Sequence, residues 1–411
     1  MAISEKTLDK LVNQLTRNVN KANEYFLKSI GEMLKQIKEL SPKEAHQLVQ
    51  MLKYGGNYND ILRELSNLSG IPRKEIEKVF YNYAKIDQNF YKNFYEYRNK
   101  PFIPFDENLA LKRQTRALAE ITNSTLKNFT RSRALGYSFR DTKGNVIFQG
   151  LKQTYERVLD EALLNISQGK EGFDSSMSRI LNEIGQSGLR TLDYESGRSY
   201  RLDSMVEMHL RSALNNLHNE NQKIIAKDIG ANGVEISVHE MPAPDHEEVQ
   251  GRQFTNKEYK KLQQGKIATT YEGENEGEKI QITHSRKGTY RPISEYNCYH
   301  YVFTIVLGVN KPQYSKEQLQ QIRDRNNEGF ELDGKHYTMY QGTQMQRLIE
   351  RKVREQQDIN TLAKASDNFD LEIKSQKNIN KLLNTYNKIN KATGLRPNTK
   401  KLYSEGYRFT K

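Results

Sequence analysis

The sequence predicts a mainly α-helical, elongated protein of many helices, with a small α+β unit whose short β-strands lie around residues 233–310. Three observations lead to this fold class. Apolar residues recur every three or four positions over most of the chain, which is the spacing of one buried helix face. The chain is polar, with 36% hydrophobic residues and a mean hydropathy of −0.86, as long solvated helices require. Strand-like alternation is concentrated in the stretch that begins at residue 233.

Four regions follow from these changes of pattern along the 411 residues, a length that suits two or three domains. We expect an N-terminal helical region over residues 1–100 and a central helical region over 101–232. A small α+β domain with a His/Cys cluster should cover 233–312. A C-terminal helical region with a basic tail should cover 313–411.

The N-terminal region is predicted to form a series of helices. One apolar stripe is built at three-to-four spacing from Leu8, Leu11, Leu15, Val19, Ile30, Leu34 and Ile37. A capping box with proline at the first helical position starts a new helix at Ser41, and Gly55-Gly56 ends it. Ile71-Pro72 opens another helix. Two prolines within residues 99–107 predict a linker before the central helices.

Short strands are predicted at a few places. Residues 136–150 alternate around a central glycine, as a hairpin or a surface loop does. In residues 233–240 one face is apolar and the other is polar, because side chains alternate across a strand. Residues 279–284 are another strand candidate. Residues 301–309 are apolar nearly throughout, as a buried central strand would be.

The chain beyond Ser315 is predicted to be helical again. Thr343 begins a capping-box pattern, and the helix after it is expected to be amphipathic. Glu350 precedes Arg354 by four residues, the order that stabilises a helix through an ion pair.

The charge balance narrows the class of partner. The chain has 64 basic and 51 acidic residues, a net charge of +13 and a pI near 9.3. This excess favours contact with nucleic acid, and it also suits a large solvated helical surface, so both interpretations stay open. We expect no membrane span, because no run of about 18 apolar residues occurs, and the charged N-terminus does not resemble a signal peptide. A single cysteine excludes an intrachain disulfide framework and fits a reducing compartment.

The densest stretch for chemistry is HEMPAPDHEEVQGRQF, residues 239–254, together with the NCYH sequence that ends at residue 300. His239, His246, Cys298 and His300 supply four nitrogen or sulfur ligands, the number that suits one tetrahedral zinc ion. The single residue between Cys298 and His300 is tighter than the usual spacing of zinc ligands. His284 is a spare candidate.

Two other interpretations of this stretch stay open. A nucleophilic Cys298 would need a neighbouring cation or helix N-terminus to depress its pKa, which a sequence does not show. In a structural motif, hydrogen bonds would instead connect the Pro-Ala-Pro turn to the loop before residues 301–309. The members of this motif would be His239, Pro244, His246, Gln250, Gly251, Asn297, Cys298 and His300. His209 and His218 are expected to be ordinary surface or interface residues. No phosphate loop, dinucleotide fingerprint or paired-carboxylate motif occurs.

The order of short motifs resembles the phage minor capsid protein 2 family and, more distantly, head-morphogenesis proteins at or near the portal. The resemblance covers residues 110 to 370. The matching motifs start in residues 187–216 and end in residues 339–354. Between these ends stand Ile236-Ser237-Val238-His239, Ala243-Pro244, His246, Gln250-Gly251, Asn297-Cys298 and His300. Val249 stands where an aromatic residue is usual in the family, and Tyr299 stands where arginine is usual.

The resemblance implies a minor capsid protein of a tailed bacteriophage and implies no enzymatic activity. Such a protein is located in the virion, at the head interior or portal vertex, and in the host cytoplasm during assembly. Its partners would be the portal protein, the major capsid protein or both, with non-specific contact to double-stranded DNA, and its role would be head morphogenesis or DNA packaging and ejection. The expected cofactor is none or one structural zinc ion. A metal-dependent hydrolase or nuclease built on the His/Cys cluster is the alternative, and a DNA-binding scaffold outside the virion is a third.

Overall fold

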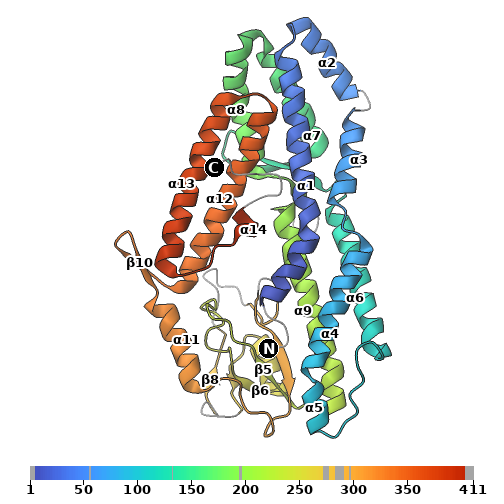
Figure 1. Ribbon diagram of the computed structural model, residues 1–411, viewed down its shortest axis with the longest axis vertical. Coiled ribbons are helices and arrows are strands. Elements are labelled where there is room, and N and C mark those ends of the chain that lie inside the picture. The colour runs from blue at the N-terminus through green and yellow to red at the C-terminus, as the bar shows by residue number, and fades with distance from the viewer. Residues whose placement is uncertain are drawn as a thin grey trace. The chain divides into compact units, whose positions relative to one another are not determined.

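The structure, a computed structural model, describes residues 5–54, 57–131, 133–193, 197–271, 277–282, 291–295 and 298–402. These residues are mainly helical, with short antiparallel strands in small sheets (Figure 1). The predicted fold class, mainly α with a small α+β unit, is therefore confirmed. In the described part of the chain, no helix combines the length and the apolar character that crossing a bilayer requires.

The chain divides into two compact units, each assembled from segments that lie far apart in the sequence. Unit 1 consists of Met1–Val12, Arg73–Asn123 and Met208–Gln344, and unit 2 of Asn13–Pro72, Ser124–Glu207 and Met345–Lys411. The chain passes from one unit to the other within α1 (Glu5–Lys38), α6 (Leu109–Phe129), α9 (Leu202–Ile229) and α12 (Met339–Ala365). The four regions predicted from the sequence were drawn from local sequence pattern and not from tertiary contacts. They remain a prediction.

Unit 2 is built mainly from helices. Besides its parts of the four shared helices it contains α2 (Pro42–Tyr54), α3 (Asn57–Ser69), α7 (Leu151–Asn165), the 3-10 turn η1 (Ile166–Gln168), α8 (Gly169–Ser187), α13 (Phe369–Thr393) and α14 (Thr399–Leu402). Figure 1 shows α12 and α13 side by side, and Asn360 on α12 joins them by donating to the carbonyl of Glu372 and to Ser375.

The sheet of unit 2 has the strand order β2-β1-β3-β4 and is antiparallel. Its strands are β1 (Leu135–Arg140), β2 (Val146–Gly150), β3 (Arg190–Leu192) and β4 (Ser199–Arg201). β1 and β2 form a hairpin, which decides between the two alternatives that the sequence left for this segment. Asp141 shapes its turn by accepting the amides of Lys143 and Asn145 at 2.9 and 2.7 Å, and Gly144 takes a φ of +83°.

In its described residues, unit 1 combines helices with three small sheets. Its helices, besides the shared ones, are α4 (Arg73–Phe90), α5 (Lys92–Tyr97), α10 (Asn256–Gln263) and α11 (Lys316–Glu328). Its strands are β5 (Gly233–Ile236), β6 (Gln253–Thr255), β7 (Ala268–Thr269), β8 (Lys279–Ile280), β9 (Val302–Ile305), β10 (Phe330–Leu332) and β11 (Lys335–Tyr337). β7 pairs with β8, β10 pairs with β11, and the third sheet has the order β6-β5-β9.

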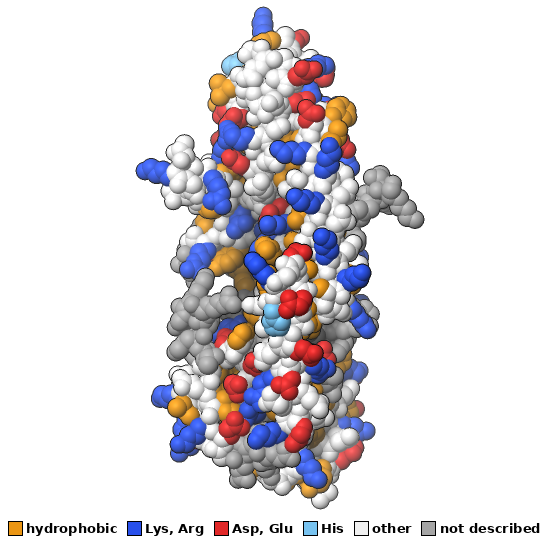
Figure 2. All heavy atoms as spheres, turned by 90° about the vertical axis from the view of Figure 1, so that its left-hand side faces the viewer, with side chains coloured by type: hydrophobic (Ala, Val, Ile, Leu, Met, Phe, Trp, Pro, Cys, Tyr) orange, Lys and Arg blue, Asp and Glu red, His pale blue; other side chains and the backbone are white. Residues whose placement is uncertain are grey.

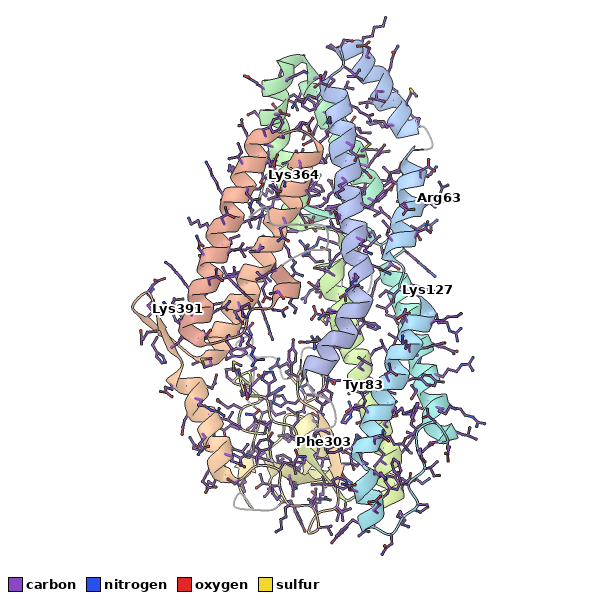
Figure 3. The ribbon with its side chains drawn as sticks, in the orientation of Figure 1. Arg63, Tyr83, Lys127, Phe303, Lys364 and Lys391 are labelled. Carbon is purple, nitrogen blue, oxygen red and sulfur yellow. The ribbon has the colours of Figure 1, made fainter. Side chains whose placement is uncertain are left out.

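The position of β9 differs from the prediction of a central strand. β9 lies at the edge of its sheet, and β5 is the central strand. β9 is apolar nevertheless because both of its faces are covered. Val302 packs in one apolar cluster with Ile236 and Val249, and Phe303 packs in another with Tyr91 and Ile225. Figure 3 labels Phe303 within this part of the chain.

His218 corrects a second expectation, because it is buried rather than a surface residue. It lies on α9 with 1% of its surface exposed. Its Nδ1 lies 2.9 Å from a carboxylate oxygen of Asp87 on α4, and its Nε2 lies 3.0 Å from the carbonyl oxygen of Val302 on β9. The ring therefore links two helices and a strand inside unit 1.

Candidate metal centre

The first part of the candidate site is the loop that follows β5. The amide of His246 donates to the carbonyl of Ala243 at 2.9 Å, which closes a four-residue turn. Pro244 is exposed and occupies the second position of this turn, where a fixed φ is favourable. The amide of Val249 then donates to the carbonyl of His246 at 3.3 Å. The two turns direct the His246 side chain inward, where 1% of the residue is exposed.

Gly251 ends this loop in a conformation that favours glycine. Its φ is +70°, and a Cβ at this position would lie 2.5 Å from Leu319 and 2.9 Å from Val238. Its amide donates to the carbonyl of Ile236 at 2.8 Å, which returns the chain to β5. The neighbouring Gln250 is thereby held in the interior with 2% of its surface exposed.

The second part of the site is the segment before β9. The carbonyl of Cys298 accepts from Asn215 of α9 at 3.4 Å, and the carbonyl of His300 accepts from the Ser294 hydroxyl at 3.0 Å. The two residues are separated by one position. This spacing does not prevent both side chains from reaching His246.

Three of the four predicted metal ligands meet in unit 1. The Cys298 sulfur lies 3.5 Å from Nδ1 of His246 and 3.6 Å from Nδ1 of His300. The ligand atoms of the three residues all lie within 4.8 Å of one another. All three residues are buried, with exposed fractions of 8% for Cys298, 1% for His246 and 3% for His300.

Hydrogen bonds on the far side of each ring fix which nitrogen carries the proton. Nε2 of His246 lies 2.9 Å from the carbonyl oxygen of Arg291, which only accepts, so this nitrogen is protonated. The Gln250 side-chain oxygen accepts the amide of His239 at 2.9 Å, and the same oxygen lies 3.2 Å from Nε2 of His300. That nitrogen is therefore protonated as well. In the neutral rings, both Nδ1 atoms present lone pairs to the sulfur of Cys298.

The electrostatics of the cluster favour neutral rings and a protonated thiol. Burial lowers the pKa of His246 and takes the pKa of His300 well below its usual value, with the nearby His246 ring adding to the effect on His300. Burial also raises the pKa of the Cys298 thiol. A reactive cysteine needs the opposite shift, so these surroundings do not favour Cys298 as a free nucleophile.

The remaining predicted site residues fall around the three-residue cluster or outside the described residues. His239 is not part of the cluster. Its ring centroid lies 6.3 Å from that of His300, and its Nδ1 accepts the amide of Met241 at 3.2 Å. Asn297 and the spare candidate His284 lie outside the described residues.

The pair of Arg291 and Asp245 is a part of the site that the sequence did not indicate. Arg291 donates from Nε and Nη2 to the two carboxylate oxygens of Asp245 at 2.8 and 2.5 Å. This forked pair holds the Arg291 backbone beside His246, the residue that follows Asp245. Forty-five positions separate His246 from Arg291, so no local motif links them.

Comparison with known protein families identifies a match. The family model described as phage minor capsid protein 2 matches residues 3–388, nearly the whole chain. The match includes the N-terminal hundred residues, which the short motifs had not reached. No curated protein and no solved structure matches the chain.

Proposed function

The chain belongs to the phage minor capsid protein 2 family, and from that membership we propose that it is a structural protein in the head of a tailed bacteriophage. Membership implies a virion location and contact with other virion proteins. We place it at the portal vertex or the inner capsid surface, near the packaged DNA, where it assists head assembly or genome packaging and ejection. The portal protein, the major capsid protein or both would be its partners.

One helix of unit 2 supports the proposed contact with DNA. α13 carries a row of exposed lysines, here called the α13 lysine stripe: Lys374, Lys377, Lys381, Lys388 and Lys391. Their spacing of three, four, seven and three residues places them on one side of the helix. The buried residues of α13, among them Leu371, Ile379 and Tyr386, occupy the other side. The stripe is therefore the solvent face of an amphipathic helix.

The charge of the stripe is not balanced by neighbouring acids on its own helix. The last acidic residue of α13 is Glu372, and none follows in the sequence before Glu405. No described carboxylate forms an ion pair with any of the five lysines. In Figure 2, which shows the side on which α13 lies, basic side chains predominate over the upper part, and Figure 3 labels Lys391 near the end of the helix.

The stripe has dimensions that suit a nucleic-acid backbone. From Lys374 to Lys391 it is about 25 Å long at 1.5 Å per helical residue. A turn of B-DNA is about 34 Å long, so the lysines can follow phosphates over much of one turn. Lysine contacts to phosphate carry no base preference, so binding without sequence specificity is expected.

The composition of mature particles tests the proposed virion location. We expect mass spectrometry of purified, salt-washed particles to find the chain in a few copies, far below the major capsid protein, which serves as the internal reference. In intact particles the chain should resist added protease if it lies inside the head. A chain that is abundant in infected cells but missing from mature particles would instead be an assembly factor, and the proposal of a structural head protein would be wrong.

A hydrolase or nuclease built on the His/Cys cluster gains no support from the structure. The three side chains are buried, and both carboxylates next to His246 in the chain have partners: Asp245 is paired with Arg291, and Glu247 accepts from Asn326. A general base for metal-assisted hydrolysis would need a free carboxylate or a similar group beside the ion.

A further inference from the structure

The cluster of His246, Cys298 and His300 contains more hydrogen-bond acceptors than donors. The Arg291 carbonyl and the Gln250 side-chain oxygen accept from Nε2 of His246 and Nε2 of His300. Each ring therefore carries its proton on Nε2 and has a lone pair on Nδ1. The only hydrogen between them is that of the Cys298 thiol, at 3.5 and 3.6 Å from the two nitrogens. One thiol hydrogen satisfies one acceptor. The other buried nitrogen would remain without a donor, at a cost of about 1–3 kcal/mol.

We propose that this cluster binds a structural Zn²⁺ ion through Nδ1 of His246, Sγ of Cys298 and Nδ1 of His300. A cation accepts both nitrogen lone pairs and the deprotonated sulfur at once, which removes the mismatch between donors and acceptors. Imidazole and thiolate together are ligands that zinc prefers over magnesium or calcium. Bound zinc deprotonates a coordinating thiol outright, so burial of the thiolate is compensated by the ion.

The distances from the Cys298 sulfur to the two nitrogens suit tetrahedral zinc. Bond lengths of about 2.3 Å to sulfur and about 2.0–2.1 Å to nitrogen place the sulfur about 3.5–3.6 Å from each nitrogen at the tetrahedral angle. The separations in the structure are 3.5 and 3.6 Å. Three protein ligands are one fewer than a closed structural zinc site usually has, so a water molecule would complete the tetrahedron.

The groups behind the ligands complete the assignment. Metal-binding histidines usually donate their second N–H to a carbonyl or carboxylate, which fixes the ring and the tautomer. His246 does this to the Arg291 carbonyl and His300 to the Gln250 side chain. The Asp245–Arg291 pair in turn holds the Arg291 backbone. The ion would therefore join the loop after β5 to the segment before β9.

Metal analysis of the purified full-length chain tests this assignment. Protein expressed with added zinc and purified without chelator should contain one zinc per chain. Cys298→Ser, His246→Gln and His300→Gln should each lose the zinc. His239→Gln is the matched control, because His239 lies beside the cluster but outside the ligand set, and it should keep the zinc. Gln250→Ala should weaken zinc affinity by about 10–100-fold, as loss of a partner behind a ligand does.

If the ligand variants do not fold, cobalt substitution of the wild-type protein tests the same assignment. Wild-type protein in which Co²⁺ replaces zinc should show a near-ultraviolet charge-transfer band from the thiolate and the visible bands of tetrahedral cobalt. The proposal is wrong if folded wild-type protein, supplied with zinc or cobalt, holds far less than one ion per chain and shows no thiolate band. The three-ligand assignment is wrong if His239→Gln loses the ion as completely as His300→Gln. Metal content is independent of the proposed virion location, so either can fail without the other.

Discussion

At the scale of single residues, the buried charges of unit 2 form the clearest electrostatic feature. Asp203 accepts from Arg354 at 2.7 Å and from Arg201 at 3.4 Å, and its carboxylate also accepts the amide of Ser204 at 2.7 Å. Arg201 also donates to Asp358 at 3.1 Å. Burial on its own would raise the pKa of Asp203, but the two arginines outweigh burial and hold that pKa well below its usual range.

This shift predicts a dependence of stability on pH. The folded state holds the Asp203 pKa below the unfolded value of about 3.9, so its contribution is fully present above about pH 4 and is lost as pH falls below that value. Asp203→Asn should reduce the free energy of unfolding by about 3 kcal/mol at pH 7, because it leaves two largely covered arginines short of a partner. At pH 3 the difference between wild type and variant should be about 1 kcal/mol smaller.

Denaturant unfolding of both proteins across this pH range measures the difference. Asp160→Asn is the control, since Asp160 pairs with Lys53 but its side chain is 56% exposed. That variant should cost under about 1 kcal/mol at every pH. A gap between wild type and Asp203→Asn that stays constant from pH 7 to pH 3 would contradict the assigned shift.

At the scale of elements, helix packing in unit 2 depends on small residues that face α12. A Cβ at Gly185 on α8 would lie 2.4 Å from the side chain of Ile359 and 2.7 Å from its backbone nitrogen. A Cβ at Gly31 on α1 would lie 2.3 Å from the Cβ of Ala365. Neither glycine has a positive φ, so close approach between helices, rather than backbone conformation, requires glycine there.

Gly185→Ala should therefore destabilise unit 2 although alanine is the better helix former. In an open helix the change would stabilise by about 0.5–1 kcal/mol. Here the methyl group meets backbone atoms that cannot move without separating α8 from α12, and we expect a loss of about 3 kcal/mol. Gly150→Ala adds the same methyl group where nothing lies within 4 Å, and it should cost under about 1 kcal/mol. Thermal melting of the two variants measures this, and equal losses would contradict the packing explanation.

Local pattern predicted the elements better than their environment. The hairpin and the start of α2 followed from turn and capping residues such as Gly144 and Ser41, because these signals act within a few positions. The capping box predicted at Thr343 is wrong, because Thr343 lies inside α12, which begins at Met339. The Thr338 hydroxyl accepts the amide of Gln341 at 3.2 Å instead. The two-sided burial of β5 did not follow. Glu235 was expected on a polar face, but it is buried and accepts from Gln253 at 2.8 Å. Gln253 and the residues that bury β5 come from segments distant in the sequence. The alternation of polar and apolar residues along one strand does not predict such contacts.

Tertiary contacts also override local pairing in α12. The four-residue spacing of Glu350 and Arg354 predicted an ion pair along the helix. In the structure Tyr386 of α13 donates to Glu350 at 2.9 Å, and Arg354 donates to Asp203 at 2.7 Å. Buried positions select partners from neighbouring helices, whereas the spacing rule describes isolated, solvated helices.

At the scale of the whole molecule, the sequence predicted the candidate site more fully than the arrangement that supports it. The residue types and order of His246, Cys298 and His300 made a metal centre one of three interpretations left open, and the structure brings these three residues together. His239 has the same chemistry but lies to one side, since the turn after β5 directs it to Met241. The role of Arg291 depends on a backbone carbonyl, which every residue has, so its identity gave no signal.

Net charge and the arrangement of charge make different predictions for DNA binding by the whole chain. If the net charge of +13 alone attracts DNA, removal of any five exposed lysines should weaken binding equally. If the α13 lysine stripe contacts phosphates, its five lysines should matter most. Two variants with the same net charge distinguish these cases. One replaces the stripe with glutamine, and the other replaces five exposed lysines on other elements, Lys78, Lys100, Lys127, Lys143 and Lys257.

The salt dependence of binding to double-stranded DNA is the measurement. Each phosphate contact contributes about 0.9 to the slope of log K against log salt, so loss of five contacts should reduce that slope by about 4. The control variant should change the slope by less than about 1, because its five lysines lie in five different segments of the chain and do not form one row along a single helix. Two duplexes of unrelated sequence should be bound equally, since phosphate contacts read no bases. Equal slopes for the two variants would show that overall charge, rather than α13, attracts DNA. A strong preference for one duplex would contradict phosphate contact as the basis of binding.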